Sequence, residues 1–428
     1  MSAVEAGAAL RRALRRDGDS LELLGERLEP AQPIALLAVG KAALPMAEAC
    51  EAIAGAALRR GLCVHAGDPG AALLRSRKLQ GSHPVPDARS AIAGRAVLDF
   101  VAGGEAGELL VVLLSGGASA LMACAEPGLE TGDLARTTAL LLEAGADIEA
   151  TNVVRKHLSA VAGGKLASRA SAQRICVLAI SDVPPQRFDL LGSGPFAADP
   201  SDFGAAIDVL RRFALLAAVP APVRRHLEAG ARGERRENPK PGDPDLARVR
   251  HECLADNAAA LRAAEERARS LGFASLCVSE RLRGEARVAG RRLGALLRSA
   301  RPARPTCLVA GGETVVAVRG AGRGGRSQEL ALAAALELAG QPGVALLAAG
   351  TDGVDGPTSA AGAFCDGGSV ARGRAAGVEA SQALAANDSH GFFRAEGGLF
   401  EPGPTGTNVR DLVLMQLDPS ALAPACSA

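Results

Sequence analysis

The sequence predicts an α/β protein of two domains, the first of them built on a doubly wound parallel sheet. At 428 residues the chain is too long for one ordinary core. Short apolar runs of β type end in Gly or Asp, and most are followed by a longer stretch rich in Ala and Leu. This alternation is typical of a parallel sheet flanked by helices, in which ligands bind beyond the carboxyl ends of the strands.

Three apolar runs mark the strands expected in the first domain. They cover residues 34–39, 109–114 and 175–180, and a glycine or an Asp lies within two residues of each. Continuous apolar runs of this length are typical of buried parallel strands. A helix is expected after Asp87, because Ala93, Val97, Phe100 and Val101 recur at helical spacing and form one apolar face.

A polar, proline-rich stretch at residues 230–245 is interpreted as a linker or an exposed loop. It separates an N-terminal domain, 1–235, from a C-terminal domain, 246–428. In the second domain we expect strands ending at residue 256 and covering 275–278 and 306–310, a hairpin partner at 314–318, and a last strand at 344–349. Helices are expected up to about residue 271, up to about residue 299 and over 328–338.

Composition and charge narrow the class of function. Lys and Arg number 48 and Asp and Glu 47, so no net field draws the chain to nucleic acid or to an anionic membrane. The nine cysteines are scattered without a CxxC pair, which favours a reducing compartment. Neither a signal peptide nor an apolar stretch of membrane-spanning length is recognisable. We therefore expect a cytoplasmic protein with a small-molecule partner.

Five glycine-rich turns carry a charged or hydroxyl residue at a strand end, a pattern that suits phosphate or carboxylate. Lys41 follows Gly40 at the first turn of an expected helix, where the helix dipole disfavours a cation. This lysine is either a solvated surface residue or a phosphate ligand. The turn from Ser115 to Ser119 is a plain tight turn, a phosphate-binding nest or a nucleophile elbow, although the elbow's last glycine is missing.

Residues 320–325 match the G-x-G-x-x-G pattern of dinucleotide-binding proteins, which makes a dehydrogenase the main rival interpretation. Against it, Arg323 and Arg326 lie in a loop where backbone N–H groups should suffice. The next candidate acid, Asp352, is also farther from Gly320 than the spacing of about 20 residues that is usual for that fold. Two guanidinium groups at this turn favour a triphosphate tail instead.

Loop carboxylates supply candidates for Mg²⁺ binding and for orienting an attacking hydroxyl. They are Asp182, Glu313, Asp352 and Asp355, although Asp-Gly is also a common turn sequence and the spacing of an EF-hand is missing. His83 and His157 are interpreted as hydrogen-bonded packing residues, because no pattern of zinc ligands surrounds them.

Eleven motifs, in this order along the chain, resemble those of glycerate kinases that form 2-phosphoglycerate, a family with DUF4147 and MOFRL regions that is often mislabelled hydroxypyruvate reductase. The motifs lie at residues 39–43, 83–87, 114–121, 152–159, 163–167, 181–183, 192–195, 311–314, 324–329, 350–358 and 403–408. Three positions depart from the pattern. Ala118 replaces a glycine, Ser327 replaces an Asn, and residues 184–187 replace a Gly-Asp pair.

The resemblance implies a larger Rossmann-like N-terminal domain, a smaller α/β C-terminal domain with a MOFRL-type region at about 306–415, and an active site in the cleft between them. It implies transfer of the γ-phosphoryl group of ATP to D-glycerate, with Lys41, Arg326 and Asp182 catalytic and Asp182 and Asp352 binding Mg²⁺. The residues expected to bind substrate or nucleotide are Gly40, Ser115, Gly116, Gly117, Ser119, Arg155, Lys156, Glu313, Gly325 and Asn408. An NAD(P)H-dependent hydroxypyruvate reductase and a non-catalytic nucleotide-binding module are the alternatives, and a homodimer is left open.

Overall fold

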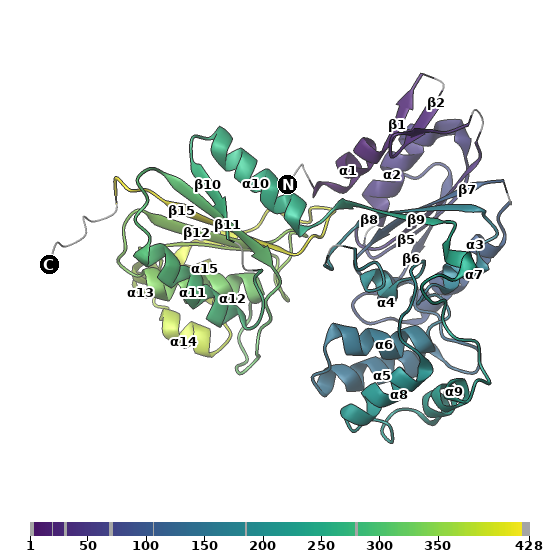
Figure 1. The fold of residues 1–428 in the computed structure, drawn as a ribbon. Coiled ribbons are helices and arrows are strands. Elements are labelled where there is room, and N and C mark those ends of the chain that lie inside the picture. The colour runs from purple at the N-terminus through teal and green to yellow at the C-terminus, as the bar shows by residue number, and fades with distance from the viewer. Residues whose placement is uncertain are drawn as a thin grey trace. The chain divides into compact units, whose positions relative to one another are not determined.

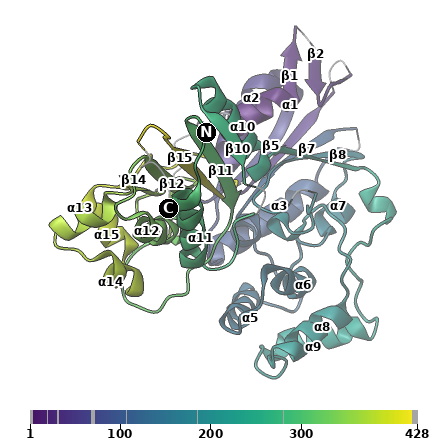
Figure 2. The same ribbon diagram turned by 60° about the vertical axis from the view of Figure 1, so that its left-hand side comes forward.

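The computed structural model describes residues 4–18, 20–29, 32–67, 72–105, 107–184, 186–278 and 281–421. The chain divides into two compact units (Figures 1 and 2). The N-terminal unit comprises Ala6–Leu254, and the C-terminal unit comprises Ala255–Ala428 together with Met1–Glu5. The division therefore lies beyond the predicted linker at 230–245.

A six-stranded sheet in the order β6-β5-β4-β7-β8-β9 forms the centre of the N-terminal unit. Its strands are β4 (Ile34–Val39), β5 (Leu58–His65), β6 (Ser76–Gln80), β7 (Leu109–Ser115), β8 (Arg174–Ile180) and β9 (Val249–Ala255). The pairs β4/β5, β5/β6, β4/β7 and β7/β8 are all parallel. The three predicted strands and the doubly wound order are confirmed. The chain proceeds outward from β4 on one side and from β7 on the other, so these two central strands mark the switch point.

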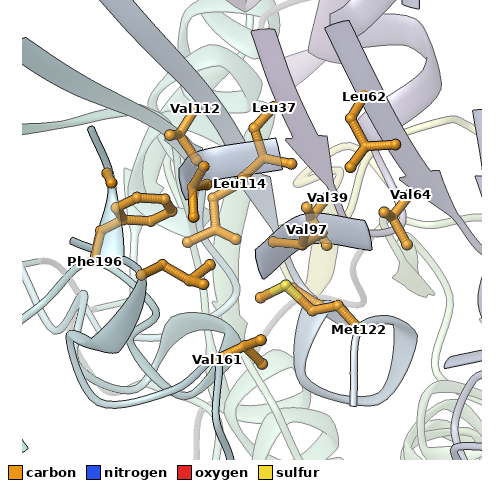
Figure 3. Packing of buried hydrophobic residues seen from close by; sticks show 14 of the residues in the cluster. Leu37, Val39, Leu62, Val64, Val97, Val112, Leu114, Met122, Val161 and Phe196 are labelled. Atoms are coloured by element: carbon orange, nitrogen blue, oxygen red, sulfur yellow. The ribbon is translucent and has the colours of Figure 1, made fainter. Parts of the chain in front are cut away.

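Helices cover both faces of this sheet (Figure 1). On one side lie α1 (Ala6–Ala13) and α2 (Ala43–Ala54), and on the other α3 (Ala88–Ala102), α4 (Ala118–Leu121) and α7 (Lys165–Arg169). The predicted helix after Asp87 is confirmed as α3, and the Asp87 carboxylate caps it by accepting hydrogen bonds from two backbone N–H groups. Alternate strand residues, among them Leu37, Val112 and Leu114, pack against Val97 of α3 in the core of Figure 3.

A helical layer with its own apolar core completes the N-terminal unit. It contains α5 (Thr131–Glu143), α6 (Ile148–Leu158), α8 (Phe203–Arg212) and α9 (Ala221–Ala231). Short 3₁₀ turns cover Gly55–Ala57, Leu191–Ser193 and Pro244–Leu246. A small antiparallel sheet of β1 (Leu14–Asp17), β2 (Ser20–Leu23) and β3 (Glu26–Arg27) follows α1.

Of the two interpretations of 230–245, the linker between domains is wrong, because this stretch lies within the N-terminal unit, whereas much of it is an exposed loop. The Asn238 amide donates to the buried carboxylate of Asp199 at 2.7 Å, and the backbone N–H of Asp199 donates to the carbonyl of Pro239 at 2.9 Å. The chain then enters β9, which lies beside β8 in the same sheet. The stretch combines exposed positions, among them 231–234 and 241–242, with the buried Asn238, which is a partner for a buried charge.

The C-terminal unit contains a mixed six-stranded sheet in the order β10-β11-β15-β12-β13-β14. Its strands are β10 (Ala274–Cys277), β11 (Thr306–Gly312), β12 (Val344–Gly350), β13 (Gly362–Asp366), β14 (Leu399–Phe400) and β15 (Asp411–Leu417). Strand β15 is antiparallel to both β11 and β12 and lies between them. The predicted hairpin of 306–310 with 314–318 is therefore wrong, as is the prediction that 344–349 is the last strand, because β15 pairs with β11 from far along the chain.

In the described part of this unit, the helices that flank the sheet are α10 (Asn257–Ser270), α11 (Ala286–Ser299), α12 (Arg326–Leu338), α13 (Ser369–Ala375), α14 (Ala380–Ala385) and α15 (Ser389–Glu396). In Figure 1, α10 lies on one face, whereas α11, α12 and α15 lie on the other. The predicted helices that end near 271 and 299 and the helix at 328–338 are confirmed. Helix α12 is buried on most sides, which explains its run of alanine and leucine.

Candidate active site

The candidate site residues of the N-terminal unit lie where β4 and β7 end side by side. The backbone N–H of Lys41 donates to the carbonyl of Gly116 at 2.9 Å, and that of Ala42 donates to Ser115 Oγ at 3.0 Å. Gly40 has a φ of 131°, and an added Cβ would lie 2.2 Å from Ser115 Oγ. Glycine is therefore required at position 40. Ser115 is 1% exposed, so its hydroxyl joins the two turns rather than offering a free ligand.

Lys41 and His83 converge on Gly117, the residue that begins helix α4. Gly117 has a φ of 87°, and an added Cβ would lie 3.0 Å from Cδ2 of His83 and 3.3 Å from Cγ of Lys41. His83 is exposed, so its interpretation as a packing residue is wrong. His157, by contrast, is fully buried with Nδ1 2.8 Å from the carbonyl of Val153, as expected for a packing residue.

Asp182 reaches the same strand ends from the turn after β8. An added Cβ on Gly116 would lie 2.0 Å from Asp182 Oδ2, so the carboxylate lies directly against the backbone of Gly116. The structure thus brings Gly40, Lys41, Gly116, Gly117 and Asp182 to one end of the sheet, as parallel strands require.

Ser119 belongs to a chain of hydrogen bonds that the sequence did not reveal. Its Oγ lies 2.8 Å from Ser193 Oγ, which donates to Asn152 Oδ1 at 2.9 Å. Ser193 adopts a φ of 60°, an uncommon backbone conformation for a serine. Ser193 was not among the predicted site residues, although its place in the motif at 192–195 was the available signal.

Arg155 and Lys156, adjacent on α6, have different environments. Lys156 is 3% exposed, and its Nζ lies 3.4 Å from Asp199 Oδ1 and 3.6 Å from Asp189 Oδ2. A lysine engaged in this way is a structural ion-pair residue, which argues against its predicted role in ligand binding. Arg155 is half-buried, and no hydrogen bond or ion pair joins its side chain to any other residue that the structure describes. Burial lowers the pKa of Arg155.

The candidate site residues of the C-terminal unit lie at one edge of its mixed sheet. Asp411 is paired in register with Gly312 of β11 on one side and with Gly350 of β12 on the other. Glu313 and Thr351, the next residues of those two strands, and Arg410 before β15 must therefore lie at the same edge. Glu313 Oε2 lies 3.5 Å from Arg410 Nε.

Arg326, the first residue of α12, is held at this edge by two carboxylates. Its Nε and Nη2 donate to Asp411 at 2.6 and 2.9 Å, and Nη1 lies 3.0 Å from Glu313 Oε1. Burial opposes the charge of Arg326, but the hydrogen bonds and the attraction of Asp411 outweigh it and raise the pKa of the guanidinium. Burial raises the pKa of Asp411 to about 7, with Arg326 acting in the opposite direction.

Asp355 has a structural role at the start of α12. Its carboxylate accepts hydrogen bonds from the backbone N–H groups of Ser327 at 3.1 Å and Gln328 at 2.8 Å. Gly325 allows this approach, since an added Cβ would lie 2.3 Å from Asp355 Oδ1. Asp355 thus supplies the cap that Gly325, the residue before the helix, cannot. The carboxylate places Arg326 rather than facing a ligand.

Asp352 and Asn408 lie in the loops beside the same edge. Asp352 Oδ1 accepts a hydrogen bond from the Val354 N–H at 3.2 Å, and Asn408 Oδ1 accepts one from the Arg410 N–H at 3.1 Å. Five predicted residues of this unit, Glu313, Gly325, Arg326, Asp352 and Asn408, therefore lie in the turns around the carboxyl ends of β11 and β12. The sequence analysis missed Arg410 and Asp411, although both closely follow the motif at 403–408.

The glycine pattern at 320–325 has a local explanation. A Cβ added to Gly320 would lie 2.4 Å from the carbonyl oxygen of Ala386. A Cβ added to Gly324 would lie 2.1 Å from Oγ of Ser389. These glycines let the loop pack against the α14–α15 turn. Strand β11 also ends at Gly312, well before this loop, whereas a dinucleotide fingerprint directly follows its strand. The local structure therefore does not support the dehydrogenase interpretation.

Within the described ranges, no three His, Cys, Asp or Glu side chains form a group that could hold a metal ion by themselves. None of the helices in these ranges has both the length and the apolarity needed to span a bilayer.

Comparison with known proteins identifies the family. The model of DUF4147, a domain of unknown function, matches residues 1–228, and the MOFRL family model matches residues 306–411. A glycerate 2-kinase of Pyrococcus horikoshii is 36% identical over 95% of this chain and 92% of its own length. A D-glycerate 2-kinase of Thermotoga maritima is 37% identical over 89% of this chain and 90% of its own length.

Solved structures agree with these relatives. A crystal structure of a Thermotoga maritima glycerate kinase matches with a TM-score of 0.83 at 34% sequence identity and covers 97% of this chain and 96% of its own. This likeness confirms the predicted α/β architecture and the resemblance drawn from the motifs. The chain therefore belongs to the glycerate 2-kinase family, with a DUF4147 region followed by a MOFRL region.

Proposed function

We propose that this chain transfers the γ-phosphoryl group of ATP to the C2 hydroxyl of D-glycerate. The observation that carries the proposal is the placement of Lys41 at the switch point of a doubly wound sheet, against Gly117 and beside a turn that carries Asp182. Phosphoryl transfer depends mainly on positioning and on neutralising the charge of the phosphoryl oxygens. A lysine, a glycine-rich backbone turn and a carboxylate at one strand edge supply these functions.

The C-terminal unit contributes the second cation. Arg326 carries a guanidinium whose three nitrogens are already oriented by Asp411 and Glu313. A guanidinium fixed in advance loses little entropy when it meets a phosphoryl group. That Lys41 and Arg326 serve one phosphoryl group stays a prediction. A double-mutant cycle tests it: Lys41→Met and Arg326→Ala should lower kcat non-additively if they act on the same group and additively if they do not.

Mg²⁺ fits the residues present. A kinase needs only one or two protein carboxylates for Mg²⁺, because phosphate oxygens and water supply the other ligands. Asp182, whose carboxylate lies against Gly116, and Asp352, at the edge of the mixed sheet, are the residues that would hold such an ion. Bound Mg²⁺ would supply positive charge that reduces the negative charge developing on the nucleotide phosphates.

Arg155 is the residue we propose to bind an anionic group of substrate or nucleotide. Its guanidinium carries a charge at a half-buried position, and no described carboxylate balances it. The next helical turn towards the N-terminus carries Asn152, which joins the hydrogen-bonded chain to Ser119. Arg155 thus extends from the same helix that supports the serine turn.

A single set of assays separates the candidate functions. Purified protein is incubated with glycerate and ATP, with glycerate and NAD, and with hydroxypyruvate and NADH. The kinase predicts ADP formation that requires glycerate, the reductase predicts NADH oxidation without ATP, and a binding module predicts neither. Phosphorus NMR of the product then distinguishes the 2-phosphate from the 3-phosphate, and a 3-phosphate product would contradict the proposal.

Two further predictions concern the setting of the enzyme. Eight cysteines in the described part of the chain are free thiols, which supports a reducing compartment such as the cytoplasm. Cys426 lies outside the described residues. Homodimer formation stays an open prediction that size-exclusion chromatography with light scattering would test.

A further inference from the structure

A cavity of about 340 Å³ lies in the N-terminal unit, away from the strand ends of the candidate site. Its lining comes from Glu126 and Pro127, from α7, from α8 and α9, and from the loop at 234–239. None of the predicted catalytic or binding residues belongs to this lining. A volume near the lower end of the usual range of about 300–1,000 Å³ suits a small ligand.

The acidic residues of this cavity are already paired. Three pairs hold them: Glu126 with Lys165 at 3.0 Å, Glu234 with Arg232 at 2.7 Å and Glu237 with Lys240 at 2.6 Å. Each carboxylate therefore has a nearer cationic partner than Arg169 or Arg235, although Arg235 also attracts Glu234. Lys165 is likewise committed, since its Nζ also donates to the carbonyls of Lys156 and Ser159.

Two arginines of the lining have no such partner. Neither Arg169, which is exposed, nor Arg235, which is half-buried, hydrogen-bonds or pairs with any residue in the described ranges. A third lining arginine, Arg236, has only a long contact of 3.6 Å with Asp245. The lining therefore presents two guanidinium groups that no hydrogen bond or ion pair with a described residue holds, beside carboxylates that have nearer cationic partners.

Three buried polar atoms of the same lining also lack a hydrogen-bond partner among the described residues. They are Ser168 Oγ, His226 Nδ1 and Arg235 Nε. His226 is 4% exposed, and its Nε2 lies 2.9 Å from the carbonyl oxygen of His157. Because a carbonyl only accepts, Nε2 is the donor, and the other ring nitrogen, Nδ1, has no hydrogen-bond partner among the described residues. A buried polar atom without a partner costs about 1–3 kcal/mol, so three in one cavity require an explanation.

We propose that this cavity binds a phosphate group, either as inorganic phosphate or as the phosphate of a small monoester. Tetrahedral phosphate oxygens accept hydrogen bonds from several directions at once, which suits donors that come from α7, from α9 and from the following loop. Arg235 and Arg169 supply the charge and Ser168 a hydroxyl. Nδ1 of His226 accepts from the hydroxyl of a singly protonated phosphate or, when the ring is charged, donates to an oxygen.

A planar carboxylate is the less suitable ligand, because its two oxygens lie in one plane and cannot meet donors on all sides. The site also differs from the candidate active site in its supporting residues. His226 contacts α6 through the carbonyl of His157, whereas the active-site side of α6 uses Asn152.

The test is equilibrium dialysis of radiolabelled inorganic phosphate against the full-length protein. We expect Arg235→Met to raise the Kd for phosphate at one class of binding site roughly tenfold or more, which is the effect of losing a hydrogen bond from a charged donor. Arg224→Met, a matched control on α9, removes an exposed arginine that is absent from the lining and should bind phosphate like the wild type. Lys41→Met should leave phosphate binding at this class of site unchanged. This result would distinguish the cavity from any phosphate bound at the candidate active site.

If Arg235→Met fails to fold, Arg169→Met replaces it, because Arg169 is exposed and its removal leaves no buried group unpaired. A parallel series with 2-phosphoglycerate distinguishes a monoester from inorganic phosphate, and saturable binding of either that depends on Arg235 or Arg169 supports the proposal. Equal phosphate binding by these variants, Arg224→Met and the wild type overturns it.

Discussion

Arg326 and Asp411 form a two-point ion pair, with Nε 2.6 Å from Oδ2 and Nη2 2.9 Å from Oδ1. The pair joins the first residue of α12 to the first residue of β15, so it fixes the guanidinium relative to the central strand of the sheet. The partner of the third nitrogen, Glu313, is 42% exposed, whereas Asp411 is 6% exposed. A phosphoryl group would therefore displace Glu313 more easily than Asp411.

Arg326→Ala should lower kcat by about 10²- to 10³-fold, because a preorganised charge at the phosphoryl group is lost. Arg326→Lys should recover little of the lost kcat, since an ammonium group cannot reproduce the planar arrangement of donors in a guanidinium. Steady-state kinetics with glycerate and ATP measures both. Arg319→Ala is the control, because the ion pair that the Arg319 side chain makes among the described residues is a partly exposed one with Glu285, the residue before α11. Wild-type turnover by Arg326→Ala would remove Arg326 from the mechanism.

Asp411 should make stability depend on pH between about 4 and 7. Its folded-state pKa of about 7 exceeds the ordinary value near 3.9 of an unfolded chain, so the folded state binds the proton more tightly. This contribution is fully present below about pH 4 and is lost as the pH rises through 7, and it amounts to roughly 4 kcal/mol at most.

Urea unfolding of the wild type and of Asp411→Asn at several pH values measures this contribution. Because Asn cannot titrate, the difference in unfolding free energy between the two proteins should change as the pH falls from 8 to 4, in favour of the wild type. A difference that stays constant with pH would show that Asp411 has an ordinary pKa.

Gly117 and Gly128 offer a matched test of the phosphate turn. Their φ angles are 87° and 90°, so substitution by Ala strains both backbones by a similar 1–2 kcal/mol. At Gly128 the new methyl group meets nothing within 4 Å, whereas at Gly117 it meets His83 and Lys41. We expect similar losses of stability but a loss of kcat/KM only in Gly117→Ala. Equal kinetics of the two variants would mean that the turn does not touch the substrate.

The strands of the N-terminal sheet could be predicted because residues 34–39, 109–114 and 175–180 are apolar throughout, as burial on both faces requires. Strand β15 could not, because its place between β11 and β12 depends on a pairing with residues about a hundred positions earlier. Local pattern carries no record of such a partner. The interpretation of 230–245 as a linker failed for a related reason, since only the fold shows that Asn238 donates to the buried carboxylate of Asp199.

The residues of the candidate site likewise fall into those that local sequence predicts and those that only the tertiary structure reveals. Gly40 and Lys41 were recognisable because a glycine and a lone lysine follow an apolar strand. His83 and Asp411 were not, because only tertiary structure brings one to Gly117 and the other to Arg326. Lys156 shows the opposite difficulty: a basic residue within a family motif was predicted to bind a ligand, yet it pairs with Asp199 inside the fold, which argues for a structural role.

The adjacent residues Arg155 and Lys156 therefore provide a final matched pair. Lys156→Met leaves the buried carboxylate of Asp199 without its cation and should cost about 3 kcal/mol or more of unfolding free energy. Glycerate and ATP KM values should then stay near wild type wherever the protein is folded. Arg155→Met removes a charge that pairs with no described residue, so it should preserve stability and raise KM for one substrate roughly ten- to a hundredfold. Urea unfolding and steady-state kinetics on both variants decide the assignment, and it fails if Arg155→Met alters stability alone or if Lys156→Met alters KM alone.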